Sequence, residues 1–157
     1  MVRGIERKKI FRDNKDCDDF LARLGKIVSE TSTPCYAWAL IPNHAHLLLP
    51  TGSAPLSHVM RRLLTGYAVR FNHRHRRHGK LFQNRYKSIL CQEEPYLLEL
   101  VRDIHLNPIR AGLVIDLDQL GRYWFSGNSV IVGKRHNDWQ DVDYVLKCFA
   151  QRRKAGG

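Results

Sequence analysis

The sequence of 157 residues lacks any long hydrophobic run. Apolar stretches such as residues 37–41 (AWALI) and 47–49 (LLL) fall far short of the roughly 20 residues that a membrane-spanning helix needs. The amino-terminal segment (MVRGIER) has no apolar core of the kind that a signal peptide carries. We therefore expect a cytoplasmic protein that does not enter a membrane.

Closely spaced cysteines are also missing. Cys17, Cys35, Cys91 and Cys148 form no C-x-x-C pair, which argues against a zinc knuckle or a redox pair. Without a signal peptide, we expect reduced and mostly buried thiols.

Acidic residues are absent from the middle of the chain. Residues 31–92 hold nine Lys and Arg and no Asp or Glu, so +9 of the formal net charge of +11 lies there. A stretch of one sign builds a coherent positive field, and polyphosphate is the natural partner of such a field. A solvated basic surface is the alternative, and composition favours nucleic-acid binding.

The remaining pattern predicts a folded domain, since 43% of the residues are hydrophobic and 10% aromatic. We expect one domain over residues 1–150 and a flexible tail over 151–157. The predicted elements are a helix capped by Asp16 or Asp18 and ending near residue 29, strands at 35–41 and 44–49, a helix from about residue 56 to 71, an extended segment at 80–92, a helix at 93–107 and a short helix at 141–150.

Strands and helices alternate without the Gly-rich turns of a nucleotide-binding fold. This order favours a small α+β sandwich, in which an antiparallel sheet carries helices packed on one face.

Two histidines form the sharpest local feature. In a strand, residues i and i+2 point to the same face, so His44 and His46 project together with Ala45 opposite. Two imidazoles can bind one divalent ion, but they need a further protein ligand. The alternative is that the two histidines bind no metal.

The predicted helix at 93–107 offers such a ligand. Tyr96, Glu99, Asp103, Asn107 and Arg110 lie close to one line at 100° per residue. If this polar stripe faces the histidines, it brings oxygen atoms to a metal, and otherwise it is a solvated helix face. The opposite stripe is apolar and predicts a buried face.

The basic segment mixes cations with aromatic side chains, a combination that suits single-stranded DNA or RNA. A charged loop that only aids solubility is the alternative. The candidate nucleic-acid-binding residues are Arg61, Arg62, Arg70, Arg74, Arg76, Arg77, Lys80, Arg85, Tyr86 and Lys87.

Three ordered motifs carry a family resemblance: residues 37–49 (AWALIPNHAHLLL), 79–87 (GKLFQNRYK) and 103–114 (DIHLNPIRAGLV). Together they resemble the single-tyrosine HUH transposases of the insertion sequence 200/605 superfamily, and most closely the REP-associated tyrosine transposase branch.

The resemblance implies a ferredoxin-like or RRM-like sandwich. It implies that His44 and His46, on a central strand, hold Mg²⁺ or Mn²⁺ together with Asn107. It further implies that single-stranded or hairpin DNA is cleaved by a helix-borne Tyr, which becomes joined to the 5′-phosphate. We expect a monomer or a homodimer.

Two departures from the family pattern matter. Asp103 stands where the family has its nucleophilic Tyr, and a carboxylate would form only a labile acyl phosphate. Tyr96, two helical turns earlier, is a poor substitute. The first strand, which precedes an Arg-Gly-x-x-Arg motif, is expected to be truncated here. A catalytically degenerate DNA-binding protein is therefore the alternative to an active transposase.

Overall fold

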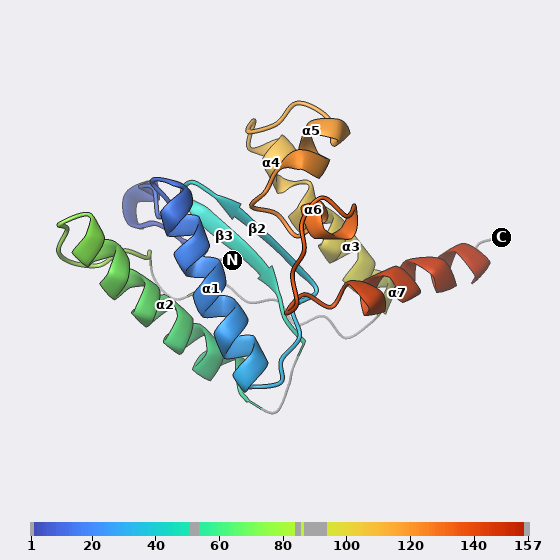
Figure 1. The fold of residues 1–157 in the computed structure, drawn as a ribbon, viewed down its shortest axis with the longest axis horizontal. Helices are drawn as coiled ribbons and strands as arrows, with labels where there is room; N and C mark the ends of the chain where they lie inside the picture. Colours follow the sequence, from blue (N-terminus) through green and yellow to red (C-terminus); the bar gives the residue numbers. More distant parts are fainter. Residues whose placement is uncertain (1, 51–53, 84–85, 87–93, 156–157) are drawn as a thin grey trace. The chain divides into compact units, whose positions relative to one another are not determined.

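The computed structural model describes residues 2–50, 54–83, 86 and 94–155 (Figure 1). Its elements, in chain order, are β1 (Val2–Arg3), the 3₁₀ helix η1 (Ile5–Arg7), α1 (Asn14–Glu30), β2 (Ala37–Ile41), β3 (His44–Leu48), α2 (Leu56–Arg74), α3 (Glu94–His105), α4 (Asn107–Arg110), α5 (Leu117–Arg122), α6 (Asn128–Ile131) and α7 (Val142–Ala155).

These elements form two compact units. The first comprises Met1–Pro34, Leu40–Ala45 and Pro50–Ser88, and the second comprises Cys35–Ala39, His46–Leu49 and Ile89–Gly157. Strands β2 and β3 contribute residues to both units.

The sheet has the order β1-β3-β2, so β3 is its middle strand. Val2 pairs with Ala45 in antiparallel register. Strands β1 and β2 are joined through α1 but are separated in the sheet by β3, which is a split βαβ arrangement. The predicted α+β class with an antiparallel sheet is therefore confirmed.

The segment after α2 returns to the free edge of β1. Phe82 forms an antiparallel bridge with Gly4, and the Gln83 N–H donates to the Arg3 carbonyl at 2.8 Å. The start of the extended segment predicted at 80–92 thus extends the sheet beyond β1. Most of the remainder of that segment lies outside the described residues. Strand β1 itself comprises two residues, Val2 and Arg3.

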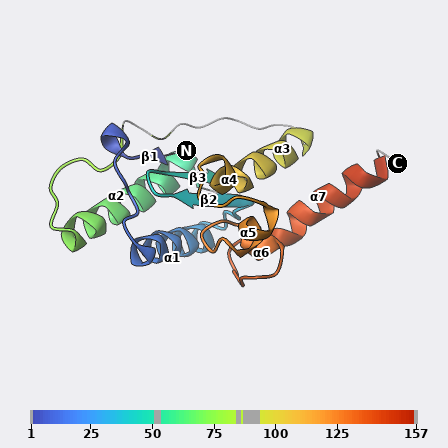
Figure 2. The same ribbon diagram turned by 90° about the horizontal axis from the view of Figure 1, so that it is seen from above.

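The first unit is built on α1 and α2, which lie side by side (Figures 1 and 2). They run antiparallel, because Glu30 at the end of α1 pairs with Arg62 near the start of α2. Between them, the ring of Phe20 meets the rings of Phe11 and Tyr67 edge-on, with centroids 5.3 and 5.2 Å apart. These aromatic contacts form the core of the unit.

The cap of α1 differs from the prediction. Asp13, not Asp16 or Asp18, is the N-cap, because its backbone is extended and its carboxylate accepts from the Asp16 N–H at 3.0 Å. Asp18 is exposed in the first turns of the helix.

Asp16 is instead a buried carboxylate that joins the two helices, with 2% of its side chain exposed. It accepts from the Arg12 N–H at 2.8 Å, from Arg74 at 2.6 Å and from His75 at 2.8 Å. Arg74 also pairs with Asp13 at 2.5 Å. The start of α1 is therefore tied to the end of α2 by a shared ionic cluster.

In the second unit, β2 is buried on both faces. Ala37 and Ala39 pack against Val101 and Ile104 of α3 and against Val145 of α7. These residues alternate along β2, so one face of the strand meets the two helices.

Trp38 lies on the other face of β2. Its indole N–H donates to the Gln140 Oε1 at 2.8 Å, and its carbonyl accepts from the Gly127 N–H at 2.7 Å. The stretch between residues 107 and 141, for which the sequence predicts no element, thus contains the short helices α5 and α6, held partly by contacts to β2.

The last helix, α7, extends to Ala155, past the predicted end at residue 150, so part of the predicted tail is helical. Cys17, Cys35 and Cys148 are buried and carry reduced thiols, as expected, and Cys91 lies outside the described residues. Among the described helices, none is both long and apolar enough to cross a membrane.

The ionic cluster predicts an acid-sensitive fold. The hydrogen bond from Arg74 lowers the pKa of Asp13 from 3.8 to about 2. A depressed carboxyl pKa contributes stability that is present above the unfolded pKa and is lost as the pH falls towards the folded one. We expect the free energy of unfolding to fall between about pH 4 and pH 2, and Arg74→Ala to flatten this dependence.

Denaturant titrations across this pH range measure the effect. Arg122→Ala is the matched control, since it removes only the exposed pair between Arg122 and Asp118. Equal acid sensitivity of wild type and Arg74→Ala would contradict the assignment.

Candidate functional site

The two candidate histidines lie on β3, the middle strand of the sheet. His44 and His46 are half-buried, while Ala45 between them is fully buried. This alternation is the one predicted for two imidazoles on the same face of a strand.

The ring of His44 is oriented by its neighbour Asn43. Its Nδ1 lies 2.6 Å from the Asn43 Oδ1, an arrangement in which Nδ1–H donates to the amide oxygen and Nε2 keeps its lone pair. Burial, together with the nearby positive charges of Arg3 and the amino terminus, lowers the pKa of His44. A neutral imidazole with a fixed tautomer is the form that ligates metals, so the residue fits a divalent ion.

A divalent ion at these histidines would need a further protein ligand. In the part of the chain that the structure describes, no group of three or more His, Cys, Asp and Glu side chains is placed to hold a metal ion. An amide oxygen such as that of Asn107 is compatible with this finding.

Helix α3 has the predicted two-sided character. Its apolar stripe is buried, and it consists of Leu97, Leu98, Val101, Ile104 and His105. On the other side, the side chain of Tyr96 is 57% exposed and that of Asp103 is 56% exposed. Asp103 forms an ion pair with Arg110 at 3.1 Å.

Asn107 is not part of α3, which corrects the predicted helix of residues 93–107. Helix α3 ends at His105, and Asn107 is the first residue of the short helix α4. Pro108 has no N–H to continue the hydrogen-bond ladder. The relation of one helical turn between Asp103 and Asn107 therefore crosses a helix break.

His105, at the end of α3, is a buried histidine whose Nε2 has no hydrogen-bond partner among the described residues. Burial lowers its pKa to about 4, so the ring is neutral near pH 7. A Cβ added to Gly127 would lie 2.7 Å from that nitrogen and 3.1 Å from the Gln140 side chain. His105, Gly127 and Gln140 are thus packed tightly together, and His105 lies two residues before Asn107.

The candidate DNA-binding cations fall into two groups. Arg74 belongs to the ionic cluster, and Arg77 donates to Asn72 Oδ1 at 2.9 Å and to the Lys80 carbonyl at 2.7 Å. Both arginines therefore brace the fold. The exposed candidates are Arg61, Arg62, Arg70, Arg76 and Lys80; Tyr86 is half-buried, and Arg85 and Lys87 lie outside the described residues.

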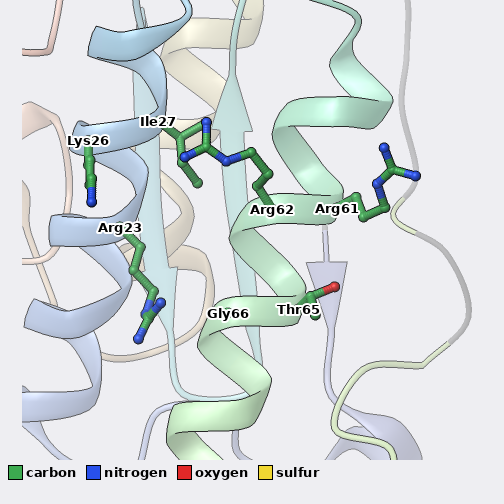
Figure 3. Close-up of a pocket in the computed structure, with 7 residues that line it drawn as sticks. All are labelled: Arg23, Lys26, Ile27, Arg61, Arg62, Thr65 and Gly66. Atoms are coloured by element: carbon green, nitrogen blue, oxygen red, sulfur yellow. The ribbon is translucent and has the colours of Figure 1, made fainter.

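Sequence reasoning missed Arg23 and Lys26 of α1. With Arg61 and Arg62 of α2 they line a groove of about 480 Å³ (Figure 3). The signal available in the sequence was their i, i+3 spacing on one helix face, but the search for cations was confined to the acid-free stretch.

Comparisons with known proteins agree with this architecture. A family model described as "Transposase IS200 like" matches residues 1–105. The fold is similar to the solved structure of a REP-associated tyrosine transposase bound to a REP hairpin, with a TM-score of 0.62 and 19% identity, covering 89% of this chain and 84% of that chain. A comparison with curated protein sequences gives no significant match.

The packing around His105 predicts the effect of Gly127→Ala. The added methyl group clashes with the imidazole and with Gln140, so we expect a loss of about 1–3 kcal/mol in the free energy of unfolding. The backbone of Gly127 has φ −60°, which alanine adopts without strain, so the effect would report packing alone.

Gly121→Ala is the matched control, because its Cβ would make an ordinary contact at 3.5 Å with Val132. Gly121 lies in α5, where alanine has the higher helix propensity. Denaturant unfolding of both variants tests the prediction, and equal stability of the two would contradict it.

Proposed function

The chain belongs to the insertion sequence 200-like transposase family, and from this premise we propose that it binds single-stranded or hairpin DNA and holds Mg²⁺ or Mn²⁺ for DNA strand cleavage and transfer. The observation that carries the proposal is the alternation of His44 and His46 about a buried Ala45 on the middle strand of the sheet. The REP hairpin bound to the structurally similar transposase supports hairpin DNA as the partner.

In this proposal, His44 and His46 hold the metal ion and Asn107 supplies an oxygen ligand. When bound, a divalent ion polarises a phosphoryl oxygen of the DNA. Asn43 keeps the His44 ring in the tautomer that presents Nε2. Exposed cations of α2 and of the loop that follows it neutralise the DNA backbone.

Asp103 is poorly suited to the covalent step. Attack by its carboxylate on phosphorus would form an acyl phosphate and release the 3′-oxygen of the cleaved strand, and water would soon hydrolyse that bond. In addition, the Asp103 carboxylate accepts a hydrogen bond from the Arg110 guanidinium at 3.1 Å.

A second candidate function therefore has its own support. The ion pair of Asp103 with Arg110 favours a protein that retains the DNA-binding surface and metal ligands but does not form a lasting covalent intermediate. The two candidates differ in one observable, which is the covalent protein–DNA adduct.

Metal titration by calorimetry tests the histidine site. We expect His46→Ala to lower Mn²⁺ affinity by more than about 100-fold and Asn43→Ala, which frees the His44 ring, to lower it by about 10-fold. His73→Ala, which removes an exposed histidine of α2, is the control and should bind as wild type does. Unchanged affinity in His46→Ala would refute the site.

Adduct formation tests the covalent step. We expect wild type to form little stable adduct with a labelled DNA hairpin in Mn²⁺, and Asp103→Tyr to form some, because a phosphotyrosine survives where an acyl phosphate does not. Denaturing gels measure the adduct.

Tyr96→Phe is the companion variant, since Tyr96 is the exposed tyrosine of α3. A strong wild-type adduct that Tyr96→Phe abolishes would show that Tyr96, not the Asp103 position, carries the nucleophile. No adduct from any variant would favour the non-catalytic candidate.

A further inference from the structure

A basic groove lies between α1 and α2 at the surface of the first unit. It has a volume of about 480 Å³ and is lined by Arg23, Lys26, Ile27, Arg61, Arg62, Thr65 and Gly66. Figure 3 shows that Arg62 reaches from α2 towards α1, while Gly66 presents no side chain to the groove.

The charges of the groove are only partly compensated. Arg23 pairs with Asp19 at 3.0 Å and Arg62 pairs with Glu30 at 2.7 Å. The hydrogen bond from Arg62, with a smaller contribution from the charge of Lys26, lowers the pKa of Glu30. The groove is thus lined by four cations, of which two are paired with carboxylates, and this leaves it net positive.

Lys26 and Arg61 carry the uncompensated charge. Within the described residues, neither makes an ion pair at 4.0 Å or less with a carboxylate, and both are exposed. No acidic residue occurs in α2, so nothing on that helix opposes an incoming anion. The hydroxyl of Thr65, one helical turn after Arg61, adds a neutral donor to the same helix face.

The position of the Arg23 side chain in the groove requires a glycine at position 66. A Cβ at this position would lie 2.7 Å from a guanidinium nitrogen of Arg23, so the guanidinium lies directly over the backbone of α2. The Asp19 carboxylate accepts a hydrogen bond at 3.0 Å from the Nε–H of this guanidinium. One cation of the groove is thus held in place before any ligand arrives.

We propose that this groove between α1 and α2 binds the phosphate backbone of DNA, as a contact surface separate from the histidine strand. This inference rests on the proposed function in that DNA is the partner. The groove suits an extended polyanion because its cations come from both helices and because Arg70, two turns after Arg62, continues the positive track along α2.

The test uses the double variant Lys26→Gln/Arg61→Gln in the full chain. These substitutions break no ion pair described in the structure, so the fold should be retained, and thermal unfolding checks this. The matched control is Lys15→Gln/Lys147→Gln, which removes the same charge from exposed lysines outside the groove. The probe is a labelled DNA hairpin with a single-stranded 5′ extension.

Fluorescence anisotropy over a range of salt concentrations measures the contacts. Each lost phosphate contact lowers the slope of log K against log salt by about 0.7 for single strands and about 0.9 for duplex DNA, so two contacts lower it by about 1.4 to 1.8. We expect this reduction and weaker binding for the groove variant, and a nearly unchanged slope for the control.

The outcomes separate the two proposals. If wild type binds the hairpin with a steep salt dependence and the groove variant behaves like the control, the groove proposal is wrong while DNA binding stands. If wild type does not bind DNA, the proposed function fails and the groove proposal fails with it.

Discussion

The ionic cluster around Asp16 is the constraint on which the first unit depends. A carboxylate that is 2% exposed is tolerated only when it is paired and hydrogen-bonded, and here Arg74 and His75 supply the charge and donors. Because Arg74 also reaches Asp13, the amino-terminal end of α1 and the carboxyl-terminal end of α2 are fixed to each other. The aromatic core between the helices is assembled within this frame.

The same pairing changes how the basic stretch acts. Counted along the sequence, residues 31–92 form a uniform positive block, but in the fold the carboxylates of α1 lie beside it and neutralise particular members. Arg74 and Arg77 become structural residues. Among the described residues, Arg61 of this stretch and Lys26 of α1 make no ion pair. The positive surface therefore includes the groove as well as the exposed Arg76 and Lys80 of the loop after α2.

The sequence was a good guide wherever a periodic pattern coincided with a buried face. The apolar stripe of α3 and the alternation about Ala45 were predicted because helices and strands impose periods of 3.6 and 2. The cap at Asp13 was missed because several acidic residues in one short stretch can cap a helix equally well on pattern alone.

Other features could not be predicted because distant contacts decide them. Helices α5 and α6 have little periodic signal, and α6 starts beside Gly127, whose N–H is held by the carbonyl of Trp38 in β2. The pairing of Arg62 with Glu30 likewise follows only from the packing of the two helices, whereas the i, i+4 pair of Arg23 with Asp19 lies within α1.

The break between α3 and α4 links the fold to the chemistry. Pro108 interrupts the helical hydrogen bonds, so the regular helix ends just before Asn107, the residue proposed as a metal ligand. The buried His105 is the last residue of α3 on the other side of that break. The ion pair from Asp103 to Arg110 then connects α3 with α4 across it. A tyrosine at position 103 would leave Arg110 without this partner. At the position where the family resemblance places a nucleophile, Asp103 thus forms an exposed ion pair, while His44 and His46 alternate about the buried Ala45 on the middle strand. The metal site and the covalent step that we propose can therefore be tested separately, because different residues carry them.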